Sequence, residues 1–153
     1  AVTEARAMLS SSRYTAGTGM GLTGNVFSNL SYTQSIERSP TVVMYGTGAS
    51  YAIQTTDDIA TLWRNSFSNS ITIAEVICET DTGSVNIQLQ RNDGSATNML
   101  SSNLACATTE ATTTSFVSGE NTLSAGHKLD FLVVSIASGT PTKISLSFRY
   151  TVN

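Results

Sequence analysis

Charged residues are scarce in this sequence. They make up 12% of its 153 residues, against roughly a quarter in an average globular domain. Eight Lys and Arg against 11 Asp and Glu give a net charge of −3, and the basic residues form no stripe that could neutralise a nucleic-acid backbone. No apolar run approaches the roughly 18 residues that span a bilayer. The sequence therefore predicts neither nucleic-acid binding nor membrane insertion.

Cysteine is equally sparse. The two cysteines, Cys78 and Cys106, have no second Cys or His nearby at the spacing of a zinc site. From the residues alone, a disulfide and two free buried thiols both remain open. A disulfide would stabilise the fold by roughly 3 to 4 kcal/mol in the chain-entropy account and would suit a protein outside the reducing cytosol. The sequence starts at Ala1 without Met or a signal segment, so we expect a removed leader or a trimmed chain, either of which agrees with export.

Hydroxyl and amide side chains take the place of the missing charges. The sequence has 23 Thr, 22 Ser and 10 Asn, which indicates a secreted or virion β-protein. Its length suffices for one buried core and is too short for two ordinary domains.

Alternation of apolar and polar residues predicts the strands. Residues 84–92 and 144–152 alternate strictly, as expected of antiparallel strands with one buried face. Further strands are predicted at residues 25–36, 41–45, 59–64, 70–79, 112–117 and 128–136. Gly, Asn and Asp mark the turns between them. Many short strands with such turns predict an all-β fold, an antiparallel, jelly-roll-like β-sandwich.

Two strands depart from plain alternation. In residues 71–78 the apolar positions change parity after Ile73, which predicts a β-bulge near Ala74 or Glu75.

Residues 129–136 are apolar on both faces. Leu129, Phe131 and Val133 form one face, and the other consists of Leu132, Val134 and Ile136. A two-layer sandwich normally covers one face of each sheet, so we expect the second set to lie at an assembly interface with another copy. Covering by the chain's own loops, or by its first 40 residues, stays open.

The first 24 residues have a different character. Residues 2–9 carry apolar side chains at helical spacing, which predicts a short helix, and residues 16–24 contain four glycines. We expect an arm and Gly-rich hinge over residues 1–24 and a sandwich domain over residues 25–153.

Motifs that could carry catalysis lack their structural context. Gly19, Gly21 and Gly24 match a dinucleotide fingerprint, but no buried strand precedes them and a predicted strand follows in place of a helix. His127 is the sole histidine and sits in a predicted turn, and no nucleophile elbow occurs. We interpret the glycines as a hinge and His127 as a turn residue.

Acidic residues give only weak support for a glycoside-hydrolysing site or a calcium site. The candidate carboxylates for glycoside hydrolysis are Asp57, Asp58, Glu75, Glu79 and Asp81. Adjacent carboxylates on turns are normally solvated, and Glu79 and Asp81 are separated from Asn92 and Asp93 by a strand of about 20 Å. We therefore expect no catalytic residue, no metal site and no cofactor.

Aromatic residues provide a possible binding surface for sugars. Tyr45, Tyr51 and Trp63 could stack on the apolar face of a pyranose. Trp63 shares its parity with Ile59 in a predicted strand, which favours a place in the core.

Several stretches of the second half resemble a β-sandwich end module of secreted bacterial proteins and of phage virion or tail-fibre proteins. These stretches are residues 77–83, 87–94, 100–106 and 123–131. The resemblance covers about half of the chain, residues 70–153, and implies a jelly roll with no reaction and no cofactor. It also implies that Cys78 and Cys106 bridge neighbouring strands. Such modules have Asp at the position of His127, which agrees with a replaceable turn residue.

The function that we expect is that of a non-enzymatic structural subunit that assembles with itself into an extracellular filament or a virion or tail-fibre component. The expected partner is a homo-oligomer or polymer of the same chain. The alternative is a carbohydrate- or receptor-binding module that recognises a cell-surface glycan. The expected location is extracellular or on a virion surface.

Overall fold

The structure is a computed structural model that describes residues 20–23, 26–29 and 39–153. The chain divides into two compact units, residues 1–34 and 35–153. In the first unit, β1 (Met20–Thr23) pairs antiparallel with β2 (Val26–Asn29). The first of these strands falls within the predicted hinge. The predicted helix at residues 2–9 lies outside the described residues.

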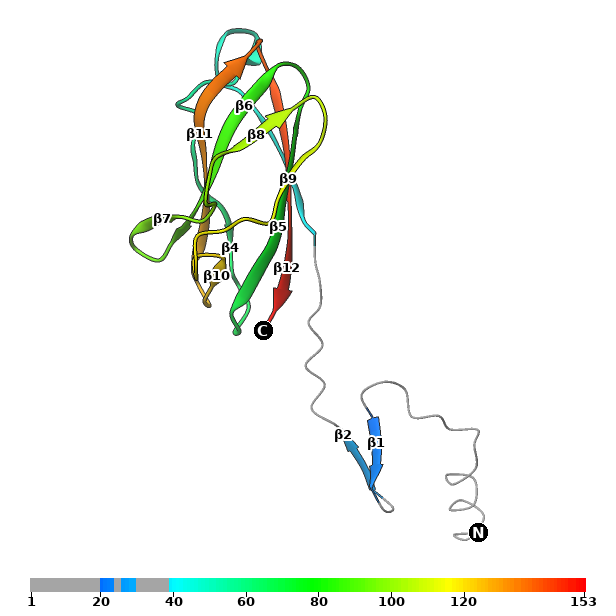
Figure 1. Cartoon of the computed structure of the whole chain (residues 1–153). Helices are drawn as coiled ribbons and strands as arrows, with labels where there is room; N and C mark the ends of the chain where they lie inside the picture. Colours follow the sequence, from blue (N-terminus) through cyan, green and yellow to red (C-terminus); the bar gives the residue numbers. More distant parts are fainter. Residues whose placement is uncertain (1–19, 24–25, 30–38) are drawn as a thin grey trace. The chain divides into compact units, whose positions relative to one another are not determined.

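The second unit is a sandwich of two antiparallel sheets (Figure 1). Its strands are β3 (Thr41–Tyr45), β4 (Ile59–Arg64), β5 (Ile71–Thr80), β6 (Ser84–Asn92), β7 (Ala96–Asn98), β8 (Leu104–Ala107), β9 (Ala111–Thr113), β10 (Thr122–Leu123), β11 (Lys128–Ser138) and β12 (Lys143–Val152). One 3-10 turn, η1 (Ala49–Tyr51), follows β3.

The strand order is that of a jelly roll. The first sheet has the order β10-β5-β12-β3, and β9 also pairs with β5. The second sheet has the order β4-β11-β6-β7, and β8 also pairs with β6. Strands β3 to β6 alternate between the sheets, and the returning strands β11 and β12 insert between earlier ones, which is the jelly-roll connectivity. The fold class predicted from the sequence is confirmed.

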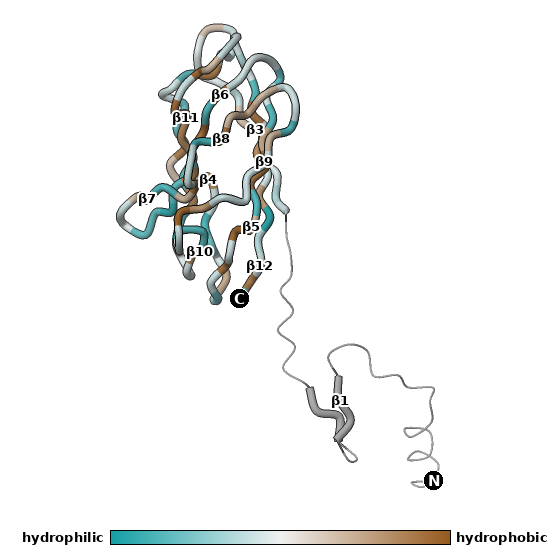
Figure 2. Tube along the Cα trace, viewed as in Figure 1, coloured by the Kyte–Doolittle hydropathy of each residue, from teal (hydrophilic) through white to brown (hydrophobic). Residues whose placement is uncertain are grey.

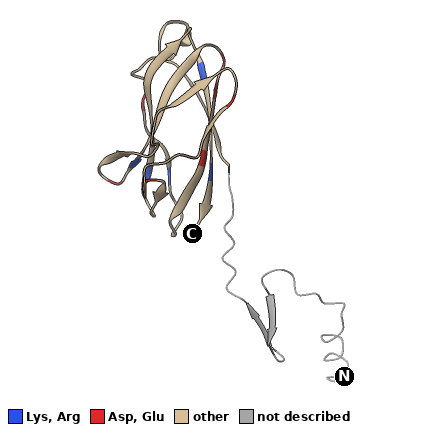
Figure 3. Ribbon diagram, in the orientation of Figure 1, with Lys and Arg blue, Asp and Glu red and all other residues tan. Residues whose placement is uncertain are grey.

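Alternating side chains build the core between the sheets. Along β12 the buried residues are Ile144, Leu146, Phe148 and Tyr150, each separated by a hydroxyl or charged residue that is more exposed. Hydrophobic and hydrophilic residues intermingle along the strands of the sandwich (Figure 2). Charged residues are few and scattered over the sandwich (Figure 3).

The predicted bulge in β5 is confirmed. Glu75 pairs with Arg149 and Ile73 with Tyr150, so Ala74 is the extra residue. Ala74 is exposed, whereas Ile73 and Val76 on either side of the bulge are fully buried. The bulge therefore keeps both halves of the strand facing the core.

A second bulge, in β11, corrects the predicted faces of that strand. Val133 pairs with Ile87 and Ser135 with Asn86, so Val134 is the extra residue. After it, Ile136 pairs with Val85 and packs against the core. Leu132, Val134 and Ile136 therefore do not share one face, because the bulge turns Ile136 inward.

A buried amide spans an interruption in the strand that borders β6. This border consists of β7 and β8, and residues 99–103 between them leave the regular ladder. Gln88, which is 4% exposed, accepts the N–H of Leu100 at 3.0 Å and donates to the carbonyl of Leu100 at 3.2 Å. Its side chain thus replaces the ladder bonds of a missing strand segment.

The two cysteines form a disulfide with a Cα–Cα distance of 5.3 Å. Cys78 lies on β5 in the first sheet and Cys106 on β8 in the second. The bridge therefore joins the two sheets across the core, which corrects the expectation that it links neighbouring strands.

Candidate functional site

Three connections meet at one end of the sandwich, the upper end in Figure 1: those between β3 and β4, β5 and β6, and β11 and β12. The N–H of Ile53 donates to the carbonyl of Pro141 at 2.8 Å. The hydroxyl of Thr82 donates to the carbonyl of Thr140 at 3.0 Å. These bonds connect all three loops, which we call the loop crown.

Asp81 holds two loops of the crown together. Its carboxylate accepts the N–H of Thr142 at 2.9 Å, of Lys143 at 3.1 Å and of Thr82 at 2.9 Å. The hydroxyl of Thr142 also donates to it. This hydroxyl is the main reason that the pKa of Asp81 falls from 3.8 to about 2, and the backbone donors add to the effect.

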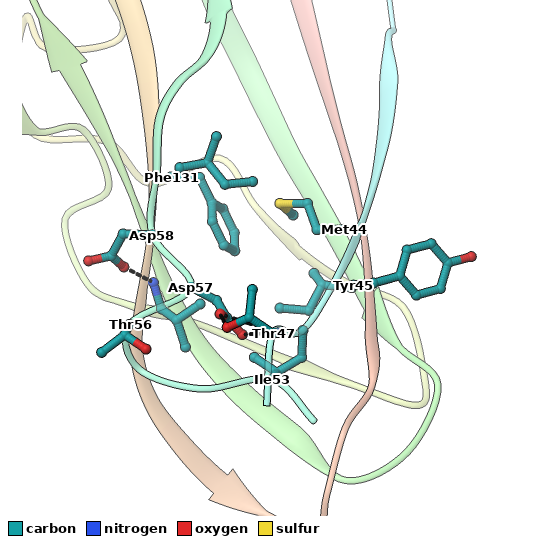
Figure 4. Close-up of a pocket in the computed structure, with 11 residues that line it drawn as sticks. Met44, Tyr45, Thr47, Ile53, Thr56, Asp57, Asp58 and Phe131 are labelled. Atoms are coloured by element: carbon teal, nitrogen blue, oxygen red, sulfur yellow. Dashed lines mark hydrogen bonds between the residues drawn. The ribbon is translucent and has the colours of Figure 1, made fainter. Parts of the chain in front are cut away.

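A cavity of about 270 Å³ lies beneath the connection between β3 and β4 (Figure 4). Apolar side chains from both sheets and from the loop line it: Met44, Ile53, Ile59, Phe131, Val133 and Ile144. The remaining lining residues are Tyr45, Thr47, Thr56, Asp57 and Asp58. The ring of Tyr45 points away from the cavity (Figure 4). The cavity is thus an apolar hollow with a polar rim.

The two carboxylates on this rim bind backbone groups. Asp57 accepts the N–H of Gln54 at 2.8 Å and of Thr47 at 3.1 Å, and also the hydroxyl of Thr47. Burial alone would raise the pKa of Asp57, but these hydrogen bonds outweigh it and lower the pKa. Asp58 accepts the N–H of Val133 at 2.8 Å, next to the bulge in β11. Both groups shape the loop, and they do not face each other as an acid and base would.

Two other residues considered for catalysis, His127 and Glu75, lie in structural surroundings. The N–H of His127 donates to the carbonyl of Ser124 at 3.1 Å, and its own carbonyl accepts the N–H of Asn65 at 2.9 Å. His127 thus lies in the turn before β11, as predicted. Glu75 forms an ion pair with Arg149 at 2.9 Å on the outside of the first sheet.

The acidic residues considered for calcium stay apart. Glu79 and Asp81 lie next to the start of β6, whereas Asn92 and Asp93 lie at its far end. Asn92 donates to Asp130 at 2.7 Å. Among residues 20–23, 26–29 and 39–153, no group of three His, Cys, Asp or Glu side chains could hold a metal ion.

The three aromatic residues separate into two environments. Trp63 lies in a cluster with Phe148 and Tyr150, with ring centroids 5.7 Å and 5.5 Å away. Tyr45 and Tyr51 are 64% and 70% exposed. The structure therefore places Trp63 with the core and leaves the two tyrosines on the surface.

Large apolar side chains also remain on the outer surfaces of the sheets. Val43 on β3 is 48% exposed and Val134 at the bulge of β11 is 42% exposed. Leu132 is half-buried. Of the predicted assembly residues, Leu132 and Val134 thus keep some exposure outside the core.

Sequence reasoning missed the buried polar residues that support the second sheet. Asp130 is 6% exposed on the outer side of β11 and accepts the N–H of Thr61 at 2.8 Å. It stands among the apolar residues 129–136, and no motif in the sequence marks it as a structural residue. The positive φ of 68° at Thr61, which directs that N–H to Asp130, has no sequence signal in a β-branched residue.

The fold and these loops define the chain as an antiparallel jelly-roll β-sandwich with an inter-sheet disulfide. No protein-family model and no curated protein matches it. Among solved structures, a chain of the cyanophage Pam1 capsid asymmetric unit is similar, with a TM-score of 0.43 and 16% identity over 94% of this chain and 93% of that chain. We draw no functional conclusion from a likeness of this degree. Within the described residues, no helix has the length and apolar character that crossing a membrane requires.

Proposed function

We propose that this chain is a non-enzymatic structural subunit that associates with copies of itself, in a virion or tail-fibre component or in an extracellular filament. One observation carries the proposal. Three of the five large hydrophobic side chains that stay exposed among the described residues, Val43, Tyr45 and Val134, lie on strands at the outer surfaces of the two sheets. Flat surfaces with exposed apolar residues suit protein contacts, whereas small ligands favour clefts with convergent polar groups.

The use of the polar residues supports the same proposal. The carboxylates of Asp57, Asp58 and Asp81 are occupied by backbone donors of the loops. Their role is to fix the shape of the loop crown. Polar groups that bind the protein's own backbone make the fold rigid, and rigidity suits a structural subunit of an assembly.

The disulfide and the surface composition support a place outside the cell interior. A bridge such as Cys78–Cys106 persists where thiols are not kept reduced. Thr and Ser residues, 23 and 22 in the sequence, make a surface of low charge. We propose that the protein works extracellularly or on a virion surface.

The segment before the sandwich takes part in this proposal. We assign residues 1–24 to an arm that reaches a neighbouring copy, and β2 belongs with it because it pairs with β1 in the first unit, so the sandwich domain lies within residues 35–153. An arm can add a strand to an open sheet edge and so join two subunits without any change in either body.

Native mass spectrometry of the full chain and of a chain lacking residues 1–24 tests the proposed function. We expect the full chain to form oligomers and the shortened chain to be folded and to form smaller ones. An oligomer of unchanged size in the shortened chain contradicts the role of the arm. A full chain that stays monomeric at all concentrations contradicts the proposed function itself.

The exposure of Tyr45 and Tyr51 favours one second candidate, a module that binds a cell-surface glycan. Both rings are available for stacking, whereas Trp63 packs against Phe148 and Tyr150. A glycan array with wild type, Tyr45→Ala and Tyr51→Ala decides between the candidates. Binding that is lost in either variant supports the glycan function, and no binding by wild type removes it.

A further inference from the structure

The four edges of the two sheets differ in how well they are closed to further pairing. The edge at β4 contains Thr61 at a φ of 68° and pairs irregularly with β11. The two edges on the other side consist of short pieces, β7 with β8 and β9 with β10. Bulges and short strands are the usual protection of an edge.

The edge at β3 has neither a bulge nor an interruption. Residues Thr41–Tyr45 pair with β12 in one unbroken register and contain no charged residue and no proline. Within the described residues, β3 has no partner on its other side. An edge of this kind is a template for another strand.

The register shows which backbone groups point outward. The carbonyl of Pro40 accepts the N–H of Phe148, and the N–H of Gly46 donates to the carbonyl of Thr142. Pro40 and Gly46 therefore direct their polar groups toward β12, and Val42 and Met44 between them do the same, because this direction alternates along a strand. The N–H and C=O groups of Thr41, Val43 and Tyr45 consequently point away from the sheet.

The side chains of these same residues are exposed on the outer face of the first sheet, with Val43 at 48% and Tyr45 at 64%. Pairing of β3 with a second β3 about a two-fold axis at Val43 would place Val43 opposite Val43 and Thr41 opposite Tyr45. Each such hydrogen-bonded pair exchanges two bonds, so the three pairs would satisfy every outward polar group of both strands. Because the strand is uncharged, no like charges would meet across the axis.

We propose that β3 is a self-pairing edge that joins two copies of this chain antiparallel about Val43, so that their first sheets form one continuous sheet. This inference rests on the proposed self-association and names the contact that provides it. The partner is a second copy because the strand is complementary to itself in backbone direction, charge and side-chain size. Val–Val and Thr–Tyr cross-strand pairs are among the favourable ones.

Sedimentation velocity of the full-length chain over a range of concentrations tests this contact. Wild type should show a dimer whose fraction rises with concentration, because a five-residue strand gives a weak interface on its own. Val43→Lys and Val43→Glu should each weaken the association about tenfold, since like charges would then face each other across the axis. An equimolar mixture of these two variants should recover the dimer, because Lys and Glu then face each other.

Val43→Pro tests the backbone part of the contact. The N–H of Val43 points outward, so proline removes it without removing a bond to β12, and edge strands accept proline at such positions. Association should weaken at least about tenfold, given two lost bonds in the dimer. Val117→Lys is the matched control for Val43→Lys, because Val117 has similar exposure at 39% but lies between β9 and β10, away from the proposed contact. Thermal unfolding of each variant checks that it is folded.

The outcomes separate this contact from the broader proposal. If wild type oligomerises and the Val43 variants oligomerise equally well, self-pairing at β3 is wrong while self-association stands. If the mixture of Val43→Lys and Val43→Glu fails to recover the dimer, the two-fold register is wrong. If wild type is monomeric throughout, both the contact and the proposed function are wrong.

Discussion

The amide of Gln88 should contribute more to the free energy of unfolding than any single surface hydrogen bond does. Replacement by Met keeps the length of the side chain and removes its polar atoms. The N–H and the carbonyl of Leu100 then lose their partner, and so does the N–H of Leu89, which also donates to this amide at 3.0 Å. Leu89 and Leu100 are 0% and 1% exposed, so water cannot easily take the place of the amide.

The magnitude follows from these orphaned groups. A buried donor or acceptor without a partner costs about 1 to 3 kcal/mol, and local movement of residues 99–103 would recover part of this. We expect Gln88→Met to lower the free energy of unfolding by roughly 2 to 5 kcal/mol, a large share of the 5 to 15 kcal/mol typical of a domain.

Urea unfolding followed by tryptophan fluorescence measures this loss, because the single tryptophan, Trp63, lies against Phe148 and Tyr150 in the core. Gln90→Met is the matched control on the same face of β6. Gln90 donates to Asn98 at 2.7 Å in an exposed bond, and its loss should change stability by about 0.5 kcal/mol or less. Equal effects of the two substitutions would refute the role assigned to Gln88.

The remaining predictions concern Asp81 in the loop crown and the disulfide between the two sheets. Asp81 has a pKa of about 2 when folded and 3.8 ordinarily, so its contribution is present above about pH 4 and lost as the pH falls toward 2. Asp81→Asn should flatten this part of the stability curve in acid unfolding experiments, and an unchanged curve would contradict the assignment. The double variant Cys78→Ala, Cys106→Ala opens a loop with a separation of 28 residues and should lower stability by roughly 3 to 4 kcal/mol. Urea unfolding measures this loss, and reductant should destabilise wild type but not the double variant; equal sensitivity of the two proteins would contradict it.

Strands with regular alternation could be predicted closely from the sequence. The predicted ranges 41–45, 59–64 and 84–92 coincide with β3, β4 and β6. Burial on one face alone is enough to fix such strands, because it requires an apolar residue at every second position. The bulge at Ala74 could also be predicted, because it shifts that pattern visibly.

The bulge at Val134 could not be predicted, because both faces of residues 129–136 are apolar and a shift of parity leaves no trace there. The short strands β7, β8 and β10 were missed for another reason. Two to four residues carry too little pattern of their own, and β10 also depends on pairing with β5, far back in the chain.

The site residues also divide into those that could be placed from the sequence and those that could not. His127 could be placed in a turn from the Gly before it, and Trp63 could be placed in the core from its parity. The carboxylates of Asp57 and Asp81 could be named but not explained. Thr47 binds Asp57 within the folded loop between β3 and β4, and Thr142 comes near Asp81 only through the jelly-roll connectivity.

The cross-links of the sandwich are concentrated at one end. The bridge between Cys78 and Cys106, the carboxylate of Asp81 and the bonds between loops all lie near the crown. Regions with fewer such ties open more often than the rest of a fold. The opposite end is held by hydrogen bonds of Asn65 and Asn153 without a covalent bridge, so amide hydrogen exchange should be faster there than beside the disulfide. A structural subunit of this kind should resist mechanical force best when the force acts at the loop crown.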